Sequence, residues 1–174
     1  IITGPNGSGK STILGLLAGI YYPDSGKVFT YSENFGYIGA TPLIFESSIR
    51  DNILYGNTKG ISDKKIINFL KRLDTFKEEK SYNLENTINN RSLSSGQMQK
   101  IAFVRAILNE PDILLLDEAT ANLDEVSRAE IFKILKEQET TIINSTHDKE
   151  SFENVDHHLE VKMLGEARKI NLNF

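Results

Sequence analysis

The chain has 174 residues, of which 39% are hydrophobic and 25% charged, and its formal net charge is −4. This length suits one domain with a buried core, and the excess of acids over bases gives no support for a nucleic-acid partner. The chain contains no cysteine, which excludes disulfides, thiolate nucleophiles and cysteine-bound metals and suits a reducing compartment.

Strands and helices alternate along most of the chain, and they are read from the spacing of apolar residues. The predicted strands cover residues 1–3, 35–38, 113–116 and 140–145, and a terminal hairpin pairs 159–163 with 168–172. The predicted helices begin near Ile13, lie within 61–80, and cover 98–108, 127–136 and 148–154, while 81–92 form a polar loop. This order predicts an α/β fold with a mostly parallel, helix-covered sheet.

The first residues, Ile1 to Thr3, resemble the end of a strand that is already in progress, without a start methionine or a signal peptide. We therefore expect the N-terminal strands of the domain to lie upstream of this chain. No apolar run approaches the roughly 20 residues that cross a bilayer, so these 174 residues are not expected to form a membrane pore.

A phosphate-binding loop of the form G-x-x-x-x-G-K-[ST] follows the first predicted strand and precedes a helix. Backbone N–H groups of such a loop and the helix dipole bind the α- and β-phosphates of a nucleotide. Lys10 reaches the β- and γ-phosphates, and the Ser11 hydroxyl binds Mg²⁺. The predicted nucleotide-binding residues are Gly4, Pro5, Asn6, Gly7, Ser8, Gly9, Lys10, Ser11 and Thr12. The chain is thereby predicted to be a P-loop nucleoside triphosphatase.

Two carboxylates, Asp117 and Glu118, follow the apolar strand of residues 113–116. Ligands of open α/β sheets bind at the carboxyl ends of the strands. Asp117 is predicted to hold Mg²⁺, and Glu118 is predicted to be the base for the water that attacks the γ-phosphate. Alone, two acids after a strand indicate no more than a solvated strand end; with the phosphate loop they form its expected partner.

The segment Leu93, Ser94, Ser95, Gly96 and Gln97 resembles the L-S-G-G-Q signature of ABC (ATP-binding cassette) ATPases. Other motifs follow in the order of that family. Ala121, Asn122, Leu123 and Asp124 match its D-loop, and His147 matches its switch histidine, which contacts the γ-phosphate. A serine before a helix is by itself an ordinary N-cap. The resemblance implies instead that the signature faces the γ-phosphate held by a second subunit.

The resemblance implies a single ATP-binding domain over 1–174, with a small helical subdomain at about 47–110 that carries the signature. It implies ATP and Mg²⁺ as ligands and a second nucleotide-binding domain, identical or different, as partner. Residues 47–56 and 118–120 are similar to exporters, which implies a transmembrane domain fused upstream and a place at the cytoplasmic face of a membrane. The alternative is a soluble ABC ATPase, such as a translation factor or an assembly ATPase.

Three features depart from the usual family pattern, and two histidines need another role. The position after residues 35–38, usually glutamine, is Ala40, so slow or poorly coupled hydrolysis is expected. Ser95 replaces a signature glycine, and the aromatic residue that stacks on adenine is expected upstream of this chain. His157 and His158 are predicted to be structural, because adjacent side chains of an extended segment point to opposite faces.

Overall fold

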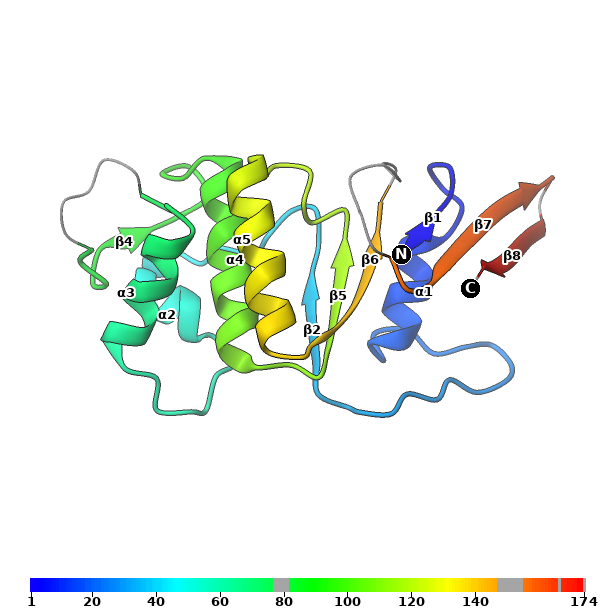
Figure 1. The fold of residues 1–174 in the computed structure, drawn as a ribbon, viewed down its shortest axis with the longest axis horizontal. Helices are drawn as coiled ribbons and strands as arrows, with labels where there is room; N and C mark the ends of the chain where they lie inside the picture. Colours follow the sequence, from blue (N-terminus) through cyan, green and yellow to red (C-terminus); the bar gives the residue numbers. More distant parts are fainter. Residues whose placement is uncertain (77–81, 147–154, 166, 174) are drawn as a thin grey trace.

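A computed structural model describes residues 1–76, 82–146, 155–165 and 167–173. Within these residues a six-stranded sheet has the order β2-β5-β6-β1-β7-β8, with every pairing parallel except the antiparallel β7–β8 hairpin. Figure 1 shows β2 and β5 both pointing toward the upper edge of the molecule, where the loop between β1 and α1 also lies. The α/β class with a mostly parallel sheet is thus confirmed.

Apart from β3, α2 and β4, the described elements follow the predicted order. The strands are β1 (Ile2–Thr3), β2 (Phe35–Ile38), β3 (Ser47–Ser48), β4 (Thr87–Ile88), β5 (Ile113–Asp117), β6 (Thr141–Ser145), β7 (His158–Leu164) and β8 (Ala167–Asn173). The helices are α1 (Lys10–Leu17), α2 (Ile49–Leu54), α3 (Asp63–Arg72), α4 (Ser95–Asn109) and α5 (Glu125–Glu137). In the described residues, no helix combines the length and apolar composition that crossing a bilayer requires.

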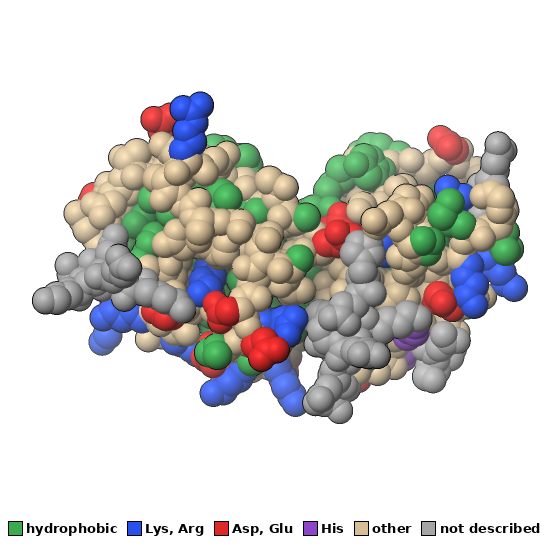
Figure 2. Space-filling view, turned by 90° about the horizontal axis from the view of Figure 1, so that it is seen from above, with side chains coloured by type: hydrophobic (Ala, Val, Ile, Leu, Met, Phe, Trp, Pro, Cys, Tyr) green, Lys and Arg blue, Asp and Glu red, His purple; other side chains and the backbone are tan. Residues whose placement is uncertain are grey.

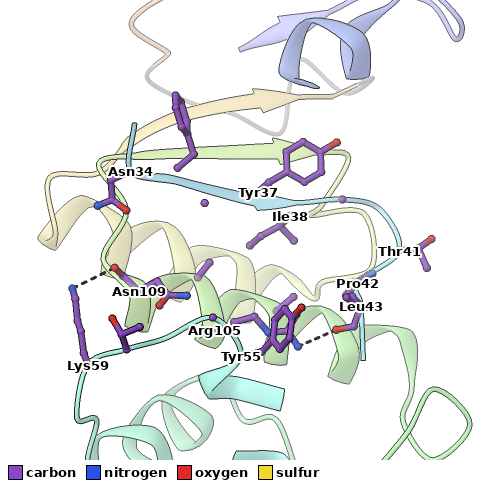
Figure 3. Close-up of a pocket in the computed structure, with 17 residues that line it drawn as sticks. Asn34, Tyr37, Ile38, Thr41, Pro42, Leu43, Tyr55, Lys59, Arg105 and Asn109 are labelled. Atoms are coloured by element: carbon purple, nitrogen blue, oxygen red, sulfur yellow. Dashed lines mark hydrogen bonds between the residues drawn. The ribbon is translucent and has the colours of Figure 1, made fainter. Parts of the chain in front are cut away.

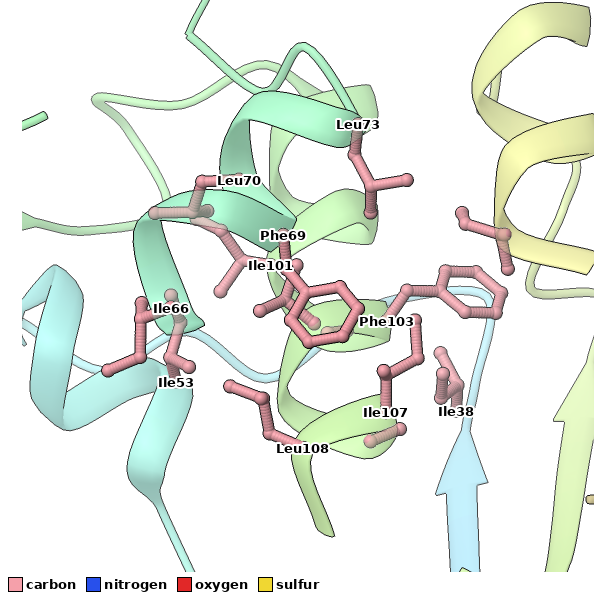
Figure 4. Close-up of a cluster of buried hydrophobic side chains, with 14 of the residues drawn as sticks. Ile38, Ile53, Ile66, Phe69, Leu70, Leu73, Ile101, Phe103, Ile107 and Leu108 are labelled. Atoms are coloured by element: carbon pink, nitrogen blue, oxygen red, sulfur yellow. The ribbon is translucent and has the colours of Figure 1, made fainter. Parts of the chain in front are cut away.

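Side chains of β5 alternate between two hydrophobic clusters, one on each face of the sheet. Ile113 and Leu115 pack with Leu14 of α1, whereas Leu114 and Leu116 join the larger cluster that α2, α3, α4 and α5 build. A strand covered on both faces reads as a continuous apolar run, which is why residues 113–116 were recognisable. Figure 4 shows the larger cluster, with fully buried Ile101, Phe103, Ile107 and Leu108 projecting from α4.

Helix α3 covers only part of the predicted helical region 61–80. It ends at Arg72 because Asp74 adopts a left-handed conformation (φ 46°) and the chain closes a C-terminal cap. In that cap the Thr75 N–H donates to the Leu70 carbonyl and the Asp74 N–H to that of Lys71. Residues 77–80 of the region lie outside the described residues.

Two further local features differ from the sequence reading. The short ladder between β3 and β4 places a strand inside the predicted loop 81–92, and α2 was not predicted as a helix. Its signal was present: Ser48 is the N-cap, and its hydroxyl accepts the Asp51 N–H at 3.0 Å. The predicted helix at 148–154 and the predicted switch histidine, His147, lie outside the described residues.

Asp124 joins α5 to α4. Its carboxylate caps α5 by accepting the Ser127 N–H at 2.8 Å and hydroxyl at 2.9 Å, and the Lys100 ammonium lies 3.2 Å away. The hydrogen bond from the Ser127 backbone, followed by the Ser127 hydroxyl and Lys100, lowers the pKa of Asp124 from 3.8 to about 2. The ionised form of Asp124 therefore favours the folded state.

The Asp124 cap predicts a pH-dependent stability. Because the pKa is lower in the folded than in the unfolded state, the contribution is complete above about pH 4 and disappears as the pH falls through about 2. Asp124→Ala should lower the free energy of unfolding by about 1 kcal/mol near pH 7, with the difference from the parent shrinking between pH 4 and 2 in urea titrations. Asp124→Asn, which keeps a capping oxygen, should lose less; a difference independent of pH would contradict a role for the charge.

Candidate functional site

The loop between β1 and α1 leaves the first turn of α1 without a side-chain cap. Its N-cap is Gly9, whose left-handed backbone (φ 97°) suits glycine, and no side chain accepts the first N–H groups of α1. Each of the other four described helices begins at a serine or aspartate whose side chain accepts such an N–H. The amino end of α1 can therefore offer its N–H donors to phosphate oxygens.

Lys10 connects this loop to the end of β5. Its side chain is 5% exposed, and its ammonium donates to the carbonyls of Gly4 at 3.0 Å and Pro5 at 3.2 Å. The same nitrogen lies 4.0 Å from a carboxylate oxygen of Glu118. The fold thus brings together two predicted site residues that are far apart in the sequence, with the cation held against the loop.

Asp117, at the carboxyl end of β5, is held by hydroxyl groups from both neighbouring strands. One carboxylate oxygen accepts the Ser145 hydroxyl of β6 at 2.6 Å, and the other accepts the Tyr37 hydroxyl of β2 at 3.0 Å. Burial, followed by the adjacent Asp117 charge, raises the pKa of Tyr37 to about 12, so this hydroxyl remains a donor. Sequence reasoning found Asp117 but missed both of its partners.

Glu118 begins the turn that follows β5. Its backbone is left-handed (φ 54°), its N–H donates to the Ser145 carbonyl at 3.2 Å, and its side chain is 38% exposed. Such a conformation costs a non-glycine residue of order 1–3 kcal/mol and recurs at functional sites. The turn directs the Glu118 carboxylate toward Lys10, while Asp117 remains within the strand.

The donor set at this edge fits Mg²⁺, which prefers oxygen ligands and retains several waters. Asp117 supplies a carboxylate oriented by two hydrogen bonds. Ser11 supplies an exposed hydroxyl in the first turn of α1. Ser8, in the same loop, has a buried hydroxyl with no hydrogen-bond partner among the described residues, which is consistent with a polar ligand in this cradle.

The signature segment forms the N-terminus of α4. The Ser94 hydroxyl accepts the Gln97 N–H at 3.2 Å and the Gln97 side chain accepts the Ser94 N–H at 2.9 Å, which is a complete capping box. Gly96 packs on the D-loop, since a β-carbon there would lie 3.1 Å from the Asn122 carbonyl oxygen. Ser94 and Ser95 are exposed, so the capped N-terminus of α4 faces outward.

The signature and the phosphate loop lie at the same edge of the molecule but on different sides of it. In Figure 1 the amino end of α4 and the loop before α1 both lie at the upper edge, with β2, β5 and β6 between them. Figure 2, viewed onto that edge, shows two lobes with an indentation between them. The N-terminus of α4 and the loop before α1 are therefore two separate surfaces of the chain.

Gln99 links the segment after β2 to the segment after Glu118. This residue of α4 is fully buried, and its amide nitrogen donates to the carbonyls of Gly39, at 3.3 Å, and Ala119. Gly39 precedes Ala40, the exposed residue at the position where the family usually has glutamine. Sequence analysis missed Gln99; its signal was a polar residue on the apolar side of a helix.

Beneath β2 lies a pocket of about 630 Å³, which is lined by this edge strand, by α4 and by the segment that follows α2. Figure 3 shows Tyr55 and Arg105 on its wall, and the Arg105 guanidinium donates to the carbonyls of Asn52 at 2.7 Å and Leu43 at 2.9 Å. At the other side of the sheet the His158 ring bonds the Thr3 hydroxyl at 2.7 Å, which agrees with the structural role predicted for His158.

Comparisons with known proteins identify what this arrangement resembles. A family profile described as "ABC transporter" matches residues 1–121. The chain is 36% identical over 162 residues to a lactococcin transport/processing ATP-binding protein LcnC-like of Lactococcus lactis, covering 84% of the chain and 23% of that protein. It is 34% identical over 180 residues to a putative export ATP-binding/permease protein of Rickettsia typhi, covering 92% and 31%.

A solved structure extends the similarity to three dimensions. The structure of a bacterial Atm1-family ABC exporter with ATP bound superposes with a TM-score of 0.79 at 28% identity, covering 91% of this chain and 31% of that chain. The chain thus spans about a quarter to a third of the length of these relatives.

The Gln99 bridge predicts that replacing the buried Gln99 destabilises the protein more than replacing the half-buried Gln138. Gln99→Leu leaves the Gly39 and Ala119 carbonyls without this donor and should lower the free energy of unfolding by about 1–3 kcal/mol, measured by denaturant titration. Gln138→Leu is the matched control, because the Gln138 amide makes one bond, to the Ile107 carbonyl at 3.3 Å, away from the site. An equal decrease in the free energy of unfolding in the two variants would show that the Gln99 bridge between Gly39 and Ala119 adds no extra stability.

Proposed function

The chain belongs to the ABC transporter family, and on this premise we propose that it is part of the ATP-hydrolysing motor domain of a membrane exporter. ATP binding and hydrolysis are the activities of this family's ATP-binding domain. The observation that carries the proposal is the approach of Lys10, in the phosphate loop, to within 4.0 Å of Glu118 after β5. A phosphate-binding cation and a carboxylate base thus share one site.

We assign the roles as follows. The loop from Gly4 to Thr12 binds the phosphates, and Lys10 contacts the β- and γ-phosphates. Ser11 and Asp117 would hold Mg²⁺, which would supply positive charge to neutralise the negative charge that develops during the reaction. Glu118 orients the attacking water and accepts its proton. His147 is proposed to contact the γ-phosphate.

The exposed signature supports a composite site shared by two subunits. Leu93 to Gln97 end in the capped, outward-facing N-terminus of α4, and the contacts of Gly96 and Lys100 go to the D-loop, Ala121 to Asp124. We propose that this N-terminus binds the γ-phosphate held by a second ATP-binding domain, identical or different. Its serine hydroxyls and N–H donors suit an anion.

The wider setting is proposed from the relatives. Their names describe transport, export and permease proteins, which favours a transporter over the soluble ABC ATPase alternative. We propose that a transmembrane domain is fused upstream, that residues 1–174 belong to one ATP-binding domain with its helical part at about 47–110, and that this domain lies at the cytoplasmic face of the membrane.

Replacing Lys10 and replacing Glu118 should affect different properties, namely ATP binding and turnover. Lys10→Ala removes the phosphate cation and should weaken ATP binding, whereas Glu118→Gln should retain binding and lower turnover by about 10²- to 10⁴-fold, as loss of an essential base does. Binding is measured with a fluorescent ATP analogue and turnover by phosphate release, both in the full-length transporter. Full turnover by the Glu118→Gln protein would remove Glu118 from its proposed role.

The composite site predicts that activity depends on protein concentration. In an intact ATP-binding domain separated from the membrane part, phosphate release per molecule should fall on dilution through the dimer dissociation range, because each ATP needs two subunits. The native partner is added if the two domains differ. Activity per molecule that stays flat across that range would argue for a site complete within one subunit.

A further inference from the structure

Tyr37 is a polar residue of the edge strand β2 that neither the phosphate loop nor the family motifs include. Its hydroxyl donates to one oxygen of Asp117 at 3.0 Å, while the Ser145 hydroxyl donates to the other at 2.6 Å. The strands that carry the two hydroxyls flank β5 on both sides. Asp117 is therefore fixed at both carboxylate oxygens by the two strands with which β5 pairs.

The register of the sheet explains how Tyr37 reaches this carboxylate. Tyr37 is paired with Leu115, and cross-strand partners share a face, so Tyr37 lies on the face that carries Leu115 and Asp117. Leu115 packs with α1, the helix that follows the phosphate loop. Figure 3 shows Tyr37 and Ile38 projecting to opposite sides of β2, with the Tyr37 hydroxyl directed toward the carboxyl ends of the strands.

Tyr37 lies on the strand whose following segment lacks the polar side chain that is usual in this family. The residue after β2 at which the family has a glutamine is Ala40, whose methyl group cannot bind a metal or a water. Tyr37 is 41% exposed and brings a hydroxyl from the same strand to the carboxylate assigned to Mg²⁺. Nothing in apolar packing requires that hydroxyl, since the ring alone would cover the same surface.

We propose that Tyr37 is a positioning residue for Mg²⁺: its hydroxyl orients the Asp117 carboxylate and supplies, from β2, the polar contact at the metal site that Ala40 does not. This proposal rests on the proposed function, because it assumes that Asp117 holds the metal of a bound nucleotide. Hydrogen-bond partners of metal ligands fix ligand geometry, and their loss typically lowers metal affinity by about 10- to 100-fold.

The test replaces only the hydroxyl. In the full-length transporter carrying Glu118→Gln, which blocks turnover, Mn²⁺ is titrated into the ATP-bound protein and bound metal is followed by electron paramagnetic resonance. Tyr37→Phe should raise the Mn²⁺ dissociation constant about tenfold, leave metal-free ATP binding unchanged and alter the Mn²⁺ line shape. The melting temperature, measured alongside, should stay close to that of the parent because the ring is retained.

Tyr31→Phe is the matched control. Its hydroxyl bonds the Asp112 carbonyl and the Thr141 hydroxyl at 2.9 Å each, near the amino ends of β5 and β6 and remote from Asp117. This variant should bind Mn²⁺ as the parent does. An unchanged dissociation constant in Tyr37→Phe, or equal losses in the two variants, would overturn the proposal while leaving the proposed function in place.

A second arm tests the relation between Tyr37 and Ala40. Adding Ala40→Gln to Tyr37→Phe should restore most of the lost Mn²⁺ affinity, because an amide oxygen then returns to this end of β2. A persistent loss in the double variant would overturn the claim that Tyr37 serves in place of residue 40. If the Glu118→Gln parent itself bound no Mn²⁺ with ATP, the proposed function and this inference would both be wrong.

Discussion

The parallel pairing of β5 with β2 on one side and β6 on the other is the constraint on which the candidate site depends. The two pairings bring the carboxyl ends of three strands to one edge, so Asp117 can accept hydroxyls from both neighbours. Burial on both faces supports this register, because a shift by one residue would exchange the contacts of Leu114 and Leu115 between the two clusters. The position of the carboxylate thus follows from hydrophobic packing.

Helix α4 connects the segment after β5 with the signature at the helix N-terminus. Its apolar residues anchor the larger cluster, while three successive contacts along its first turns reach the segment after β5: Gly96 with Asn122, Gln99 with Ala119 and Lys100 with Asp124. Buried polar groups are costly unless they are hydrogen-bonded, so these contacts favour one position of the helix. The signature surface and the turn that begins at Glu118 are therefore connected through contacts of α4.

The parts of the site that are local in sequence could be predicted without coordinates. The phosphate loop needs glycines, a lysine and a hydroxyl at short, defined spacings. The continuous apolar run of residues 113–116 predicts a buried strand. The signature was recognisable by its resemblance to the family's L-S-G-G-Q motif, and its Ser94 and Gln97 also form a capping box. Helix α2 was missed although Ser48 and Asp51 carry the same kind of signal, since its few residues show too little periodicity.

The sequence alone therefore determined the α/β class and the order of most elements. It also predicted the phosphate loop, Asp117, Glu118 and the signature as site residues, because each of these motifs lies within about one turn or strand. Only the tertiary structure decided that Lys10 faces Glu118, that Tyr37 reaches Asp117 and that Gln99 joins Gly39 to Ala119. These contacts connect residues between 20 and 108 positions apart. They arise from strand register and helix packing, which are set by the summed burial of many side chains and leave no short pattern in the chain.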